Sequence, residues 1–176
     1  MPRHSSSFAS LLLGRRTKAK FAGLALGMSL VLAGLGYGPV AHAEPLTDEQ
    51  VMTLVNYARD NITLAVYEDG SHAAPETEAE RAKELLPVED ARRIIEGGFS
   101  SGILQWCGLD WQVNMSAVLT QERDSHMWGE KQLAFINLLH GIAMVHYVET
   151  ISANNNACPD EVRAEAEKAL AGMKGE

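Results

Sequence analysis

The stretch that decides the fold is Trp128–Ile151, which reads WGEKQLAFINLLHGIAMVHYVETI. One face of this stretch is formed by residues at helical spacing: Leu133, Ile136, His140, Ala143, Met144, Tyr147 and Ile151. Other apolar residues cover much of the remaining circumference. A helix that is apolar nearly all round is buried on all sides. We therefore expect an all-α domain, in which four to five helices surround a central apolar helix at about residues 128–151.

The sequence before the central stretch predicts further helices. Residues 47–50 form a capping box, which predicts a helix that runs to about Tyr67. Residues 69–87 are rich in charge and poor in apolar side chains, so we expect a flexible or solvated connection there. A short helix is predicted over Val88–Glu96, ended by the pair Gly97-Gly98.

Two more helices are predicted on either side of the central one. The first runs from about residue 100 to 122 and carries Cys107 and Trp111 on its apolar stripe. The last begins near Pro159, followed by acidic residues that suit a helix N-terminus, and ends at about Met173.

The first 43 residues have the features of an export signal. The basic residues of this segment are Arg3, Arg15, Arg16, Lys18 and Lys20, and it contains no acidic residue. An apolar stretch over 21–36 leads to Ala41-His42-Ala43, a pattern typical of a signal-peptidase site. We expect a cleaved signal peptide at 1–43, a single domain at 44–176 and a periplasmic or secreted protein. An uncleaved anchor is the alternative.

Without the leader the chain is strongly acidic. Residues 44–176 keep 10 of the 15 Lys and Arg and all 23 Asp and Glu, a formal net charge of −13. Such a domain would be repelled by nucleic acid and by anionic membrane surfaces. We expect no nucleic-acid partner and no stable membrane insertion after signal cleavage.

The two cysteines, Cys107 and Cys158, are predicted to pair. An even cysteine count in an exported protein favours a disulfide, here closing a loop of 51 residues. Free or metal-binding thiols are the alternative, but neither cysteine has a CxxC partner.

The sequence contains no motif that carries a known chemistry. It lacks a phosphate-binding glycine loop, a GxSxG elbow and an HExxH pair. We therefore expect no enzyme, no cofactor and no metal. The weak metal-ligand candidates are His126, His140, Met144 and His146, a set in which His and Met could suit a soft metal such as copper. The competing interpretation is that His140 lies at the edge of the core, hydrogen-bonded to a carbonyl, and that Met144 fills space beside it.

Two tryptophans are candidates for a partner surface. Trp106 and Trp128 fall near the ends of the predicted helices, where an exposed indole would favour a partner or ligand. Packing at the core or its rim is the alternative, because tryptophan buries a large area.

Three features of the second half occur in a fixed order. They are Trp106-Cys107, the string Gly141-Ile142-Ala143-Met144-Val145, and Cys158 followed by a charged amphipathic helix. In this order residues 100–176 resemble the HdeA/HdeB-type periplasmic acid-stress chaperones. The resemblance implies a secreted helical domain with one disulfide, in which low pH triggers the binding of protein clients. Residues 46–98 have no counterpart in it.

These observations predict an exported helical protein that acts by binding. The first hypothesis is an acid-stress chaperone that protects periplasmic clients. A homodimer is the oligomeric state that we would test for it. The alternatives are a structural or accessory subunit that docks on an envelope protein, and a His/Met metal-binding protein. At pH values below the carboxylate pKa values the 10 basic residues and four histidines of residues 44–176 would give about +14. This charge reversal would weaken a compact state or a dimer.

Overall fold

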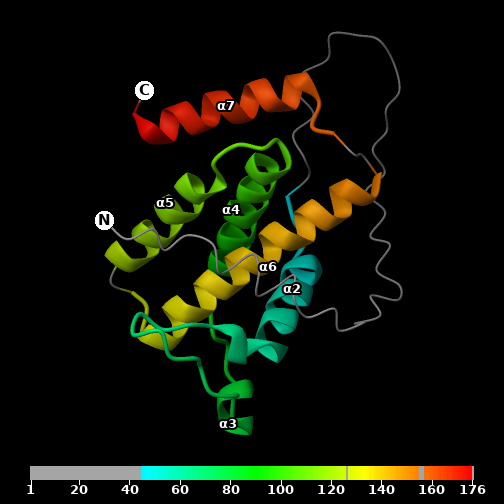
Figure 1. Ribbon diagram of the computed structural model, residues 1–176. Helices are drawn as coiled ribbons and strands as arrows, with labels where there is room; N and C mark the ends of the chain where they lie inside the picture. Colours follow the sequence, from blue (N-terminus) through cyan, green and yellow to red (C-terminus); the bar gives the residue numbers. More distant parts are fainter. Residues whose placement is uncertain (1–44, 126, 155–156, 176) are drawn as a thin grey trace. The chain divides into compact units, whose positions relative to one another are not determined.

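The computed structural model describes residues 45–125, 127–154 and 157–175, so the predicted signal peptide and its cleavage site lie outside the described residues. The described helices are α2 (Asp48–Asp60), α3 (Glu78–Arg81), α4 (Val88–Trp106), α5 (Trp111–Asp124), α6 (Glu130–Asn154) and α7 (Asp160–Lys174), with a 3-10 turn at Ile62–Leu64 (Figure 1). The described part contains no strand, and its one isolated β-bridge joins Val66 to His72. The predicted all-α fold is confirmed, and the helices of 13 residues or more number five.

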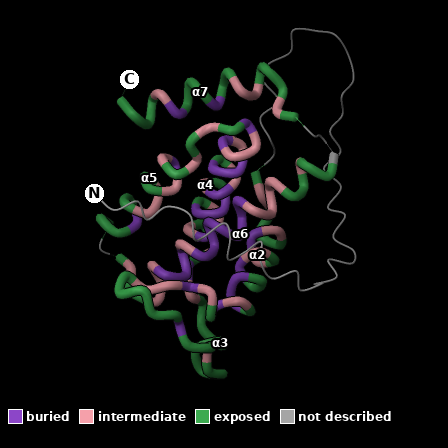
Figure 2. The backbone as a smooth tube through the Cα atoms, in the orientation of Figure 1, coloured by how far each residue is buried: buried purple, intermediate pink, exposed green. Residues whose placement is uncertain are grey.

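Helix α6 is the centre of the domain, as its apolar circumference predicts. Helices α2, α4 and α5 pack on it. Phe135, Ile136 and Leu139 on α6 are fully buried, together with Ile94 and Ile95 on α4. The buried segments of the backbone lie mainly along α4, α6 and the inner side of α2 (Figure 2). By length and composition α6 could also cross a bilayer, but 56% of its apolar window is buried inside the protein.

Helix α4 runs without a break through Gly97-Gly98, so the predicted end of a helix at this pair is wrong. The reason lies in the approach of α6. A Cβ on Gly98 would lie 2.6 Å from the His140 carbonyl oxygen, and one on Gly102 would lie 3.0 Å from Tyr147. The glycines are needed because two helices come into backbone contact there.

The true break between α4 and α5 is Gly108. Its φ of +71° is in the left-handed region that favours glycine, directly after the last turn of α4. The predicted helix over 100–122 is therefore wrong, since Cys107 ends α4 and Trp111 begins α5. Asp110 caps α5 by accepting a hydrogen bond from the Gln112 backbone.

Helix α2 begins at the predicted capping box, with Thr47 and Gln50 exchanging hydrogen bonds. It ends at Asp60 rather than near Tyr67, and a 3-10 turn follows. The predicted connection over 69–87 is largely exposed and holds the short helix α3.

The connection between α2 and α4 is fastened by one buried ion pair. Arg59 donates to both carboxylate oxygens of Glu76, at 2.8 and 2.9 Å, and the two side chains are only 8% and 2% exposed. Arg59 also donates to the carbonyls of Glu80 and Arg81 at the end of this segment. The segment is thus solvated along most of its length and is tied to α2 by this buried pair and by an exposed pair between Arg81 and Asp60.

Candidate functional site

A buried polar cluster joins α4, α5 and α6 at their closest approach. Ser101 Oγ and His140 Nε2 share a hydrogen bond of 2.9 Å, and both residues are fully buried. Asn114 Nδ2 donates to Ser101 Oγ and to the Gly97 carbonyl, each at 2.9 Å. We call Ser101, Asn114 and His140 the buried polar cluster.

Small residues on α4 make this cluster possible. Gly97 lets α5 approach α4, because a Cβ there would lie 3.2 Å from Cγ2 of Val118, while its distance to the imidazole of His140 would be an ordinary contact of 3.6 Å. Ser101 is the small polar residue one turn further along α4. The run Gly97-Gly98-Phe99-Ser100-Ser101-Gly102 thus presents backbone and a hydroxyl to α6, where larger side chains would hold the helices apart.

The second nitrogen of His140 has no partner. Nδ1 is buried and makes no hydrogen bond with any described residue. Burial, the only cause of the shift, lowers the pKa of His140 to about 4. The neighbours from α4 and α5 are Gly97, Ser101, Asn114 and Val118, none of which titrates in this range. The imidazole is therefore neutral at pH 7, and protonation would place a charge where nothing offsets it.

Ser101 and His140 have the atoms of a nucleophile and its general base. In the described part of the chain they lack the solvent access and the orienting carboxylate of a catalytic pair. Both side chains are fully buried, and no carboxylate among the described residues holds Nδ1. That the protein is not an enzyme stays a prediction.

A second buried charge lies between α4 and α5. Glu122 is 2% exposed and accepts hydrogen bonds from Arg93 and, at 2.8 Å, from the indole Nε1 of Trp128. Arg93 also pairs with Asp90 at 2.7 Å. Through these contacts with Arg93 and Trp128, Glu122 on α5 joins α4 to the segment just before α6.

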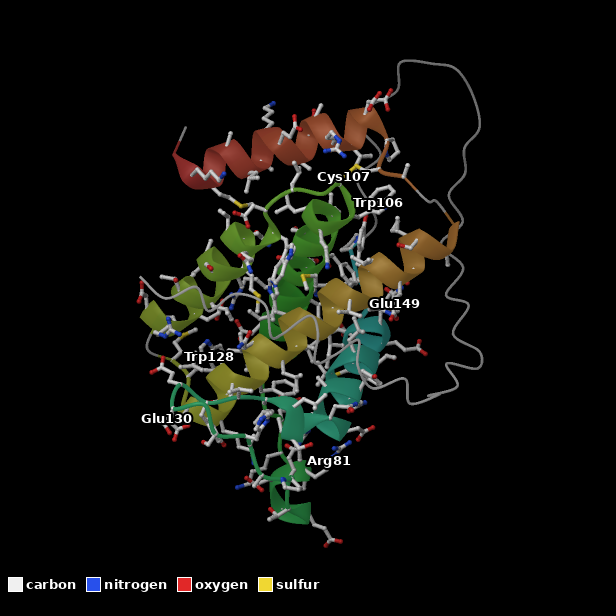
Figure 3. All side chains as sticks on the ribbon, viewed as in Figure 1. Arg81, Trp106, Cys107, Trp128, Glu130 and Glu149 are labelled. Carbon is white, nitrogen blue, oxygen red and sulfur yellow. A yellow bond between two sulfur atoms is a disulfide. The ribbon has the colours of Figure 1, made fainter. Side chains whose placement is uncertain are left out.

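The predicted disulfide between Cys107 and Cys158 is formed, with the two Cα atoms 5.0 Å apart. Cys107 is fully buried at the end of α4 and lies beside Trp106 (Figure 3). The bond therefore joins the end of α4 to the segment just before α7, whereas the predicted helix over 100–122 places Cys107 inside a helix. A disulfide agrees with an oxidising compartment.

The metal-ligand candidates are not brought together. His140 and Met144 are buried in the α4–α6 contact, and His140 already binds Ser101. His146 is half-buried beside Phe99, with ring centroids 6.5 Å apart, and burial lowers its pKa, with Glu149 opposing the shift. His126 lies outside the described residues. Within the described part, no group of three or more His, Cys, Asp or Glu could hold a metal ion.

The tryptophan candidates are both half-buried. Trp128 packs against the main core and donates to Glu122. Trp106 ends α4, and its Nε1 is buried with no acceptor among the described residues. The most exposed large apolar side chain in the described part is Met127, at 62%. A partner surface made of Trp106 and Trp128 stays a prediction.

The comparisons with known proteins return nothing. No family model, no curated protein and no solved structure matches this chain. The resemblance to acid-stress chaperones is therefore neither supported nor contradicted by them.

Sequence reasoning missed Ser101, Asn114 and Glu122. The run of residues 97–102 carries a usable signal, because it contains three glycines and two serines. Such small residues inside a helix indicate that a neighbouring helix packs closely there. Glu122 falls eight residues after Asn114, on the same face of α5. Polar residues at such inward positions indicate buried hydrogen bonds.

Proposed function

We propose that this chain is an exported helical protein that binds other proteins and that low pH activates the binding, as in an acid-stress chaperone. The observation that carries the proposal is His140, a fully buried imidazole with one unpartnered nitrogen in the tightest helix contact of the domain. Protonation of this ring destabilises the α4–α6 contact, because Ser101 is the one hydrogen-bonding partner that the ring has among the described residues.

Two buried ion pairs hold the elements beside this contact. Glu76 and Glu122 are each 2% exposed and are held by Arg59 and Arg93. The two pairs fasten the α2–α4 connection and α5 to the rest of the domain.

The disulfide keeps the acid form compact. Loss of packing with retained helices exposes apolar surface, and the bond between Cys107 and Cys158 limits how far the chain expands. The domain also becomes strongly positive in acid, which keeps it soluble while it is open.

The test uses oxidised protein lacking residues 1–43. At pH 2–3 we expect it to suppress the light scattering of an aggregating client and to bind an apolar dye, and to do neither at pH 7. A His72→Gln variant, which removes an exposed histidine, serves as the control and is expected to behave like wild type at each pH. If wild type leaves client aggregation unchanged at all pH values, the proposal is wrong.

A further inference from the structure

Helix α7 is held on a small apolar surface of its own. From α7 only Ala166 and Leu170 are buried, and they pack against α4, α5 and the turn between them. The residues beneath them are Ile103, Leu104, Leu109, Trp111 and Val113, which we call the α7 docking surface. These residues form a cluster separate from the main core around α6.

No ion pair found in the described part of the chain involves α7. The other peripheral segment, between α2 and α4, is tied by Arg59–Glu76, Lys131–Glu80 and Arg123–Glu68. Helix α7 is instead amphipathic with a largely exposed outer side (Figure 2). An element with few buried side chains opens at a lower free energy than the core does.

The disulfide lies at the N-terminal end of α7. Cys158 precedes the first residue of the helix, Asp160, by two positions, and Cys107 follows the docking-surface residue Leu104 by three. When α7 leaves its surface, the bond keeps that end attached beside it. A tethered helix returns readily and competes with any other occupant of the surface.

On the basis of the protein-binding function proposed above, we propose that α7 swings away on its disulfide and that the α7 docking surface then binds an amphipathic helix of the client. Helix α7 itself shows what fits: Ala166 and Leu170, spaced by four on one face of the helix, pack against the surface. Two buried side chains are far fewer than a stable interface between folded subunits needs, which favours a single helix over a second copy of this chain.

The experiment uses the full oxidised domain at pH 7 and a fluorescent peptide with the sequence of residues 160–174. Leu170→Ala weakens α7 without changing the docking surface, and Met173→Ala is its control, because Met173 is 43% exposed on the same helix. We expect Leu170→Ala to bind the peptide about tenfold more tightly than wild type and Met173→Ala do. Leu170→Val is the milder variant if circular dichroism shows that Leu170→Ala loses its helices.

The outcomes separate this proposal from the function on which it rests. The peptide assay needs neither acid nor a client, so the peptide can bind even if the protein fails to protect clients. Likewise, the protein can protect clients even if the peptide does not bind. Equal binding by all variants overturns the docking surface. Binding that weakens as the protein concentration rises identifies a second copy as the occupant and also overturns the client helix. In wild type, we expect the amides of α7 to exchange hydrogen at least about tenfold faster than those of α4; equal protection contradicts the proposal.

Discussion

Replacing His140 by glutamine removes a titrating group from the centre of the domain. Glutamine can still bind Ser101 through its terminal amide but takes up no proton. In wild type the pKa of His140 falls from 6.5 in the unfolded chain to about 4 in the folded protein because the ring is buried. Between these two values the unfolded chain binds more protons than the folded one, so the free energy of unfolding decreases as the pH falls.

The size of the effect follows from the pKa shift. Each pKa unit corresponds to about 1.4 kcal/mol, so His140 contributes about 3 kcal/mol at pH 7 that is lost progressively between pH 6.5 and 4. That is a large part of the roughly 5–15 kcal/mol typical of a domain. The His140→Gln variant is expected to be less stable at pH 7 by about 1–2 kcal/mol, because the amide fills the site imperfectly.

Urea denaturation of the oxidised domain at half-unit steps from pH 7.5 to 3.5 measures both effects. All carboxylates are common to the two proteins, so the difference between wild type and His140→Gln isolates the histidine. We expect this difference to shrink and then reverse as the pH falls to 4. His72→Gln, at an exposed position, is the control. Parallel curves for wild type and His140→Gln would refute the assignment of His140 as an acid-sensitive group.

Three other substitutions test the contacts on which the fold and the proposal depend. Gly98→Ala places a Cβ 2.6 Å from the His140 carbonyl and is expected to lower the melting temperature through a loss of about 1–3 kcal/mol; Gly172→Ala, where no atom lies within 4 Å, is expected to be neutral or stabilising. Glu122→Gln keeps an acceptor for Trp128 but loses the charge that pairs with Arg93, and we expect a loss of about 1–2 kcal/mol in chemical denaturation at pH 7. Replacing both cysteines by alanine is expected to cost about 2–4 kcal/mol and to expand the acid form in size-exclusion chromatography.

The parts of the fold that local sequence determines were predictable. Helix α6 is apolar on nearly every side, which leaves the centre of a helical domain as its stable place. The capping box at Thr47 uses side chains three residues apart, so its start is visible in the sequence. The pairing of Cys107 with Cys158 followed from the compartment and the cysteine count.

The errors occur where long-range contacts decide the local structure. Gly97-Gly98 has the composition of a helix end, but it lies inside α4 because α6 approaches there, more than 40 residues later in the chain. Gly108 lies inside the helix predicted over 100–122, but its positive φ ends α4. His140 is hydrogen-bonded, as its non-metal interpretation predicts, but its partner is the hydroxyl of Ser101, 39 residues away. No local pattern reports which helix will face a given residue.

Helix α4 connects the acid-sensitive contacts to the α7 docking surface. It carries Arg93 for the ion pair with Glu122, then Ser101 for the hydrogen bond with His140, then Leu104 and Cys107 for α7. These groups follow one another along a single helix. Under the function proposed above, a shift of α4 away from α6 on protonation of His140 would also move the surface on which α7 rests. The disulfide joins the end of α4 covalently to the segment just before α7, and it is unaffected by pH in the acid range. The proposal therefore requires acid to loosen the non-covalent contacts of α4 while α7 stays tethered, which is the arrangement a reversible binding surface requires.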